Sequence, residues 1–146
     1  MNREVEESVF RSCVEQYPEE VPPEKVEEEL NLMILEMKHR MQYQNLASGS
    51  ILMPTRQEME NQLADMKKEA YYAVKSELVL KRVMEQQSFT VTREELEQEA
   101  EAMAARQNTT VEMIRKFFGD DLDMLKQDLL VRKARAYVCL KGRCEP

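Results

Sequence analysis

Residues 54–89 read PTRQEMENQLADMKKEAYYAVKSELVLKRVMEQQSF and contain no glycine and, after Pro54, no proline. Thr55 is a residue type that caps helix N-termini, and Glu58 follows it at the spacing of a capping box. About 32 helical residues, each adding about 1.5 Å, give a rod of about 48 Å. This stretch therefore predicts one long helix that cannot be buried by itself, so shorter helices must pack along parts of it.

Apolar or small residues recur along this helix at alternating steps of four and three, which places them on one face. A second apolar stripe runs beside the first, so the helix presents apolar surface on more than one flank. The first stripe comprises Met59, Leu63, Met66, Ala70, Ala73, Leu80 and Met84, and the second comprises Tyr71, Val74 and Leu78.

Two helices are predicted before this stretch. The first covers residues 2–17 and is stopped by Pro18. The second begins at Pro23, whose missing N–H belongs to the unsatisfied first turn of a helix, and ends near Leu46. The residues after it, 47–50, read Ala-Ser-Gly-Ser and predict a turn.

Three helices are predicted after the long one. Thr92 with Glu95 and Thr109 with Glu112 have the spacing of capping boxes, and Gly119 closes the second, short helix. The first of these has a thin apolar face: Leu96, Ala100, Met103 and Ala104. The last helix is capped by Asp120 or Asp121, and its predicted buried face is Leu122, Leu125, Leu129, Ala136 and Leu140.

Composition agrees with a purely helical fold, because the 146 residues include only 3 Gly, a turn-forming residue, and as many as 11 Met, a helix-forming residue. The length fits one domain. The predicted fold class is all-α: an irregular array of about six long and short helices around one long central helix, in a single domain of residues 1–146.

Charge is distributed unevenly along the chain. Residues 1–30 hold ten Glu against three basic residues, a balance of −7 that equals the net charge of the whole chain. An acidic face repels phosphate backbones, so no nucleic-acid partner is expected. The basic residues near the C-terminus, which include Arg132 and Lys133, are interpreted as a solvated helix end.

No apolar run is long enough to span a membrane, and the N-terminus lacks the apolar core of a signal peptide. We therefore expect no membrane partner and a cytoplasmic location. Cys13, Cys139 and Cys144 make an odd count without a paired framework, so reduced packing thiols are expected. Cys139 and Cys144 have no third or fourth ligand nearby, and no metal site is predicted.

The sequence offers little catalytic chemistry. His39 is the only histidine, and it lies among basic neighbours where a surface or partner-contacting role is expected. There is no glycine-rich phosphate loop and no nucleophile motif. We therefore predict no catalytic residues, no cofactor and no enzymatic activity.

Methionines gather in the two helices that flank the turn at residues 47–50, at Met33, Met37, Met41, Met59 and Met66. Methionine is flexible and polarizable, so surfaces rich in it repack around varied apolar partners. Methionine at helical spacing is also common in cores, and both interpretations stay open. We expect these two helices to form a protruding antiparallel hairpin with its tip near residues 48–53.

The tip carries three consecutive apolar residues, Ile51, Leu52 and Met53. Met53 directly precedes the predicted cap, where an apolar residue often packs onto the first helical turn as a hydrophobic staple. The alternative is that the three residues form a contact surface for a partner. The sequence alone leaves both open.

Four short motifs, in order along residues 4–140, resemble the C-terminal domain of trigger factor. Residues 20–26, EVPPEKV, resemble its V-P-x-x-hydrophobic opening, and residues 70–84, AYYAVKSELVLKRVM, resemble its long helix. Residues 89–96, FTVTREEL, are similar to its I-x-V-T-x-E-E-L segment, and residues 129–134, LLVRKA, to its I-L-x-x-K segment. The family's ribosome-docking signature and its prolyl isomerase domain are not seen here, so neither activity is carried over.

The resemblance implies an ATP-independent chaperone module that holds unfolded or nascent polypeptides in a helical cradle. The alternative is a helical adaptor or assembly protein that binds one specific partner. The sequence leaves open whether the chain forms a homo-oligomer. We expect substrate binding at Met37, Met41, Ile51, Leu52 and Met53 on one arm and at Ile114, Phe117 and Phe118 on the other, with one of the two Phe partly exposed.

Overall fold

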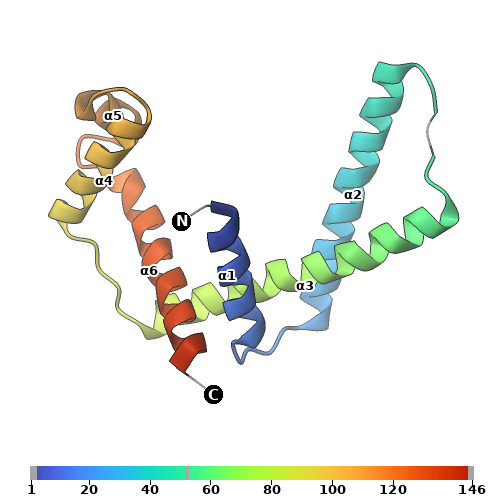
Figure 1. Cartoon of the computed structure of the whole chain (residues 1–146), viewed down its shortest axis with the longest axis horizontal. Coiled ribbons are helices and arrows are strands. Elements are labelled where there is room, and N and C mark those ends of the chain that lie inside the picture. The colour runs from blue at the N-terminus through green and yellow to red at the C-terminus, as the bar shows by residue number, and fades with distance from the viewer. Residues whose placement is uncertain (1–2, 52, 145–146) are drawn as a thin grey trace. The chain divides into compact units, whose positions relative to one another are not determined.

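The computed structural model describes residues 3–51 and 53–144, with side chains described up to residue 140. This part of the chain forms six helices and no strand, which confirms the predicted all-α class (Figure 1). The helices are α1 (Arg3–Gln16), α2 (Pro23–Ser48), α3 (Arg56–Gln86), α4 (Arg93–Arg106), α5 (Val111–Phe118) and α6 (Asp123–Cys144).

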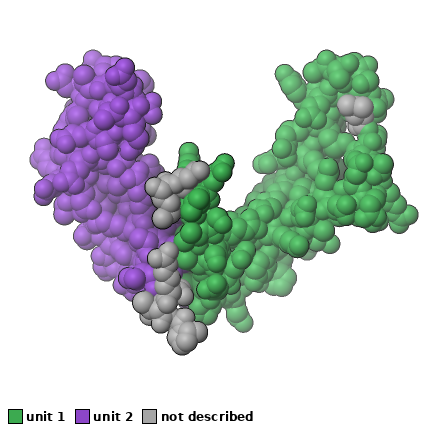
Figure 2. Space-filling view, viewed as in Figure 1, with its two compact units in different colours: residues 1–79 green, residues 80–146 purple. Residues whose placement is uncertain are grey.

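The chain divides into two compact units, residues 1–79 and residues 80–146, coloured separately in Figure 2. The division falls within α3, so one continuous helix contributes to both units. The single domain expected from chain length stays a prediction.

In the first unit, α1 packs against α3. The two helices share buried apolar residues, and polar contacts join them at the edge of this apolar contact. Arg11 Nη1 lies 2.7 Å from Glu69 Oε1, and the Arg11 guanidinium stacks 4.5 Å from the centre of the Tyr72 ring. Lys75 Nζ donates a hydrogen bond to the carbonyl of Glu15, at 2.9 Å. The buried apolar residues of the two helices in this unit are Phe10, Cys13, Val14, Ala70, Val74 and Val79.

In the second unit, α4, α5 and α6 share one core. Its buried members are Leu96, Ala100, Ala104, Ile114, Leu122 and Leu125, and Phe118 packs against them. The thin apolar face predicted for α4 is buried in this core, and Met103 packs against it. The small Ala100 and Ala104 side chains allow the neighbouring helices to approach closely.

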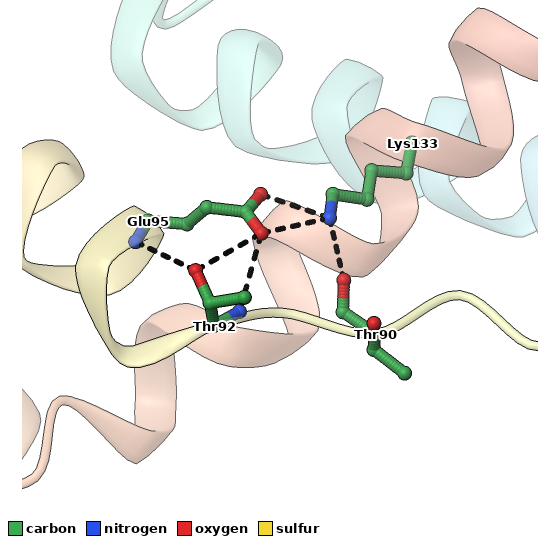
Figure 3. A network of polar contacts seen from close by, with 4 residues as sticks. All are labelled: Thr90, Thr92, Glu95 and Lys133. Atoms are coloured by element: carbon green, nitrogen blue, oxygen red, sulfur yellow. Dashed lines mark hydrogen bonds and ion pairs between the residues drawn. The ribbon is translucent and has the colours of Figure 1, made fainter.

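The predicted capping box of α4 is confirmed. Thr92 Oγ1 accepts from the Glu95 amide at 3.1 Å, and Glu95 Oε1 accepts from the Thr92 amide at 3.2 Å. Figure 3 shows that Lys133 of α6 joins this box, with Nζ 2.8 Å from Glu95 Oε2 and a further hydrogen bond to the Thr90 carbonyl. The ammonium group lowers the pKa of Glu95, and the Thr92 amide adds to the effect.

The predicted cap of α5 is wrong by one residue. Thr110, not Thr109, is the N-cap, and its hydroxyl accepts from the Met113 amide at 3.3 Å. The Thr109 amide still donates to the carbonyl of Ala104 at 2.9 Å, so Thr109 belongs to the end of the preceding helix. The turn is made by Asn108 in the left-handed region, at φ 54°, where asparagine is tolerated.

The start and the buried face of α6 also differ from the prediction. Leu122, at φ 59°, is the residue directly before the helix, where the sequence predicted Asp120 or Asp121. Asp121 lies one position earlier, and its Oδ1 accepts a hydrogen bond from the Asp123 amide at 3.2 Å. Leu122 and Leu125 are buried as predicted, but Ala136 and Leu140 are exposed. Ala134 and Val138 are buried instead, because the second half of the helix covers a different side from the first.

Candidate functional site

An open cleft separates α2 from α3 in the first unit. Figure 1 shows the two helices diverging toward the loop that joins them, so they form a V rather than the closely packed antiparallel pair that we expected. The cleft has a volume of about 620 Å³. Its lining residues are Met37, Arg40, Met41, Gln44, Met53, Pro54, Glu58, Gln62, Asp65 and Met66.

Helical spacing places the lining side chains of each wall on one face of its helix. Met37, Met41 and Gln44 are separated by four and three residues, and so are Glu58, Gln62 and Asp65 on the other wall. Each wall therefore presents one stripe of its helix, with thioethers mixed among polar groups. Such a surface offers apolar contact together with hydrogen-bond donors and acceptors.

The tip beyond the cleft is apolar and exposed. Ile51 is 83% exposed and Met53 69%, so the predicted exposure of the tip is confirmed, and a staple covers little of Met53. Leu46 lies beside Ile51 in a shallow depression at the end of α2. The remaining predicted tip residue, Leu52, lies outside the described residues.

Local hydrogen bonds build this tip. Gly49 ends α2 in the left-handed region, at φ 72°, and its amide donates to the carbonyl of Asn45 at 3.0 Å. Ser48 Oγ lies 3.2 Å from the carbonyl of Ser50. At the far end of the loop, Thr55 Oγ1 accepts from the Glu58 amide at 3.2 Å, which starts α3 as predicted.

The second group of predicted binding residues is divided by the fold. Phe117 is 72% exposed, whereas Phe118 is half-buried against the core of α4, α5 and α6. This confirms the prediction that one of the two phenylalanines stays at least partly exposed. Ile114 is 5% exposed and belongs to the core, so the expectation that it lines a binding surface is not met.

Sequence reasoning missed the polar half of the cleft. Arg40, Gln44, Gln62 and Asp65 line it at the same helical spacing as the methionines. That spacing was the available signal, but polar residues on a helix are ordinarily solvated and do not stand out.

Among the residues that the structure describes, no group of three or more His, Cys, Asp and Glu side chains could hold a metal ion. Cys13 is buried and Cys139 half-buried, and neither forms a disulfide within the described residues. No helix in the described ranges is long and apolar enough to cross a membrane.

The fold and the cleft define an all-helical module with an open, methionine-lined arm. The family model described as bacterial trigger factor protein (TF) C-terminus matches residues 1–139, and the chain belongs to this family.

Its relatives include a trigger factor from Bacillus licheniformis, 33% identical over 129 residues, covering 88% of this chain and 30% of that protein. Trigger factors from Anoxybacillus flavithermus (31% identical; 88% of this chain, 30% of that protein) and Alkaliphilus oremlandii (27%; 90% and 32%) are also similar. The chain spans about a third of the length of these curated relatives. No solved structure matches.

Proposed function

We propose that this chain is an ATP-independent chaperone module that holds unfolded or nascent polypeptides without a chemical step. The observation that carries the proposal is the open cleft between α2 and α3, whose walls are lined by methionines and whose tip exposes Ile51 and Met53. No residue of α2 is buried, so its apolar side chains remain available to a client. The predicted absence of catalysis, of a cofactor and of nucleic-acid or membrane partners, together with the cytoplasmic location, stays a prediction.

The physical basis is weak apolar contact at several places. Each side chain newly buried by a client contributes about 1.5–3 kcal/mol before the cost of ordering the client. A few such contacts correspond to roughly micromolar affinity, which suits reversible holding. Flexible thioethers adapt to clients of different shape, and the polar residues on the same walls accept hydrogen bonds from an unfolded backbone.

The distribution of exposed apolar side chains favours a chaperone over an adaptor for one partner. An adaptor needs one contiguous patch, usually rich in aromatic residues. Here the exposed residues are spread over both arms of the cleft and over α5. They include Leu32, Leu35, Tyr43, Leu46, Ile51, Met53, Met59, Leu63 and Phe117.

The test is suppression of aggregation of a chemically unfolded, unrelated protein, measured by light scattering without nucleotide. We expect Ile51→Ser with Met53→Ser, and separately Met37→Ser with Met41→Ser, to lose most of the suppression while keeping parental helicity. Leu140→Ser is the matched control, because Leu140 is a similarly exposed apolar residue outside the cleft. Equal suppression by the cleft variants and the parent would overturn the proposal, and so would an equal loss in the control.

A further inference from the structure

A separate pocket of about 440 Å³ lies between α1 and α3, and it shares no residue with the cleft between α2 and α3. Its lining includes Arg11 and Glu15 of α1 and Lys67, Lys68, Tyr71 and Lys75 of α3. Four of these side chains are cationic and one is anionic. This local excess of positive charge contrasts with the net charge of −7 of the chain.

Two of the cations hold the walls of the pocket together. Arg11 is paired with Glu69 at 2.7 Å and with Glu15 at 3.3 Å, and the bond to Glu69 raises the pKa of the guanidinium. Lys75 is only 6% exposed, and its ammonium group donates to the Glu15 carbonyl in the last turn of α1. That turn carries no basic residue of its own, so Lys75 supplies the charge that favours a helix C-terminus.

The other two cations are not used in this way. Lys67 and Lys68 are exposed, and within the described ranges neither forms an ion pair or a hydrogen bond through its side chain. Lys75 has three donors and uses one of them for the Glu15 carbonyl. The pocket therefore retains donors and positive charge beyond what packing of α1 on α3 requires.

The spacing of these groups selects the shape of a ligand. Lys68, Tyr71 and Lys75 lie three and four residues apart, so they follow one face of α3. Lys68 and Lys75 are seven residues apart, which is about 10 Å along the helix axis. In a polyproline II segment, residues three apart share one edge and are about 9 Å apart. Two carboxylates at that spacing match the helix positions of the two lysines, and Tyr71 lies between them along the helix.

We propose that this pocket binds an acidic polypeptide segment in extended form, with two carboxylates three residues apart. A compact phosphate fits less well, because the Arg11 guanidinium that would form a bidentate pair is already occupied. Lys67, Lys68, Tyr71 and Lys75 also lie well inside α3, where backbone amides are used within the helix and cannot cradle an anion. A nucleic acid would extend beyond the pocket over a chain of net charge −7, which repels its further phosphates, whereas a short acidic segment meets only the pocket.

The probe is a fluorescein-labelled peptide Gly-Glu-Pro-Leu-Glu-Gly, titrated with the full chain at low salt and followed by anisotropy. We expect Lys67→Gln with Lys68→Gln to weaken binding about two- to fivefold, because it removes the exposed ion pair of Lys68 and the neighbouring positive charge of Lys67. Lys81→Gln is the matched control, because Lys81 is an exposed lysine of the same helix outside the pocket. Binding should also weaken when salt is raised to about 0.5 M, because exposed charges are then screened.

Several outcomes would overturn the proposal. They are equal binding of a peptide with Gln in place of both Glu, unchanged binding by the double variant, or tighter binding of inorganic phosphate or of an oligonucleotide. Tyr71→Ala provides a second test that leaves the charges in place and should also weaken binding. Because the pocket and the cleft share no residue, the double variant should still suppress aggregation, so failure here is distinguishable from failure of the proposed chaperone function.

Discussion

Arg132 of α6 forms a bidentate pair with Glu99 of α4, with Nη1 2.9 Å from Oε2 and Nη2 2.8 Å from Oε1. The Glu99 side chain is only 12% exposed, and Arg106 approaches the same carboxylate at 3.3 Å. The hydrogen bond from Arg132 is the main cause of a lowered Glu99 pKa, although partial burial opposes it. The pair ties α4 to α6 through two residues that are 33 positions apart in the sequence.

This pair predicts a pH-dependent contribution to stability. A carboxylate whose pKa is lowered in the folded state contributes stability above its unfolded pKa of about 4.3, and this is lost as pH falls through the folded value. We expect Glu99→Gln to destabilise the second unit by about 1–2 kcal/mol at pH 7. The difference from the parent should shrink below about pH 4. Urea unfolding at pH 7 and at about pH 3 measures it.

Glu101→Gln is the control for this experiment, because Glu101 is an exposed acid on the same helix. A destabilisation by Glu99→Gln that is the same at both pH values would contradict the assignment.

The corrected cap of α5 gives a second prediction. Thr110→Ala should cost about 1 kcal/mol, because it removes the acceptor for the Met113 amide. Thr109→Ala, one residue earlier, should cost less than half as much, because only the backbone of Thr109 has an assigned hydrogen bond. Thermal melts of the two variants compare them directly, and an equal or reversed order would restore the cap predicted from the sequence.

The contrast between Ile114 and Phe117 gives a third prediction. Ile114→Ala should lower the free energy of unfolding by about 2–4 kcal/mol, because it leaves a cavity in the core of α4, α5 and α6. Phe117→Ala should change it by less than about 0.5 kcal/mol, because its ring is exposed. Chemical unfolding followed by circular dichroism measures both. A large loss for Phe117→Ala would show that its ring is buried in solution and exclude it from a client surface.

The left-handed conformation of Gly49 gives a fourth prediction. A Cβ at Gly49 would meet nothing within 4 Å, so any penalty comes from the backbone conformation alone. Gly49→Ala should destabilise the end of α2 by about 1 kcal/mol, and Gly49→Asn by less, since asparagine tolerates this region. Hydrogen exchange at the Gly49 position and in the last turn of α2 reports the difference. Equal exchange in both variants would contradict it.

The sequence predicted the existence and order of all six helices because each has a periodic apolar face and a recognisable cap or proline boundary. It placed Thr55 and Thr92 correctly as caps, since these residues are followed by Glu at the right spacing. The predicted cap at Thr109 was wrong. The same spacing occurs there, but the Thr109 amide donates a hydrogen bond to the preceding helix. Local pattern cannot show which of two adjacent threonines a neighbouring helix leaves free.

Tertiary features were harder to predict. Arg132 and Lys133 were interpreted as a solvated helix end, but they pair with Glu99 and Glu95 across 33 and 38 residues. The exposed tip at Ile51 and Met53 was predicted from the length of the long helix and from the Gly-Ser turn between two apolar-periodic segments, whereas the opening between α2 and α3 was not predicted. Apolar periodicity says that a helix has a contact face, but it does not say whether a neighbour or a client covers that face.

Helix α2 has 26 residues and none of them is buried. Selection on folding therefore places weaker demands on its side chains than on those of a core helix, apart from half-buried residues such as Val26, Leu30 and Ile34 and a preference for good helix formers. Substitutions along it can accumulate without damaging a core, so this arm is free to diverge faster than the rest of the chain. It is also the place where a different recognition sequence can be grafted while the rest of the molecule keeps its fold.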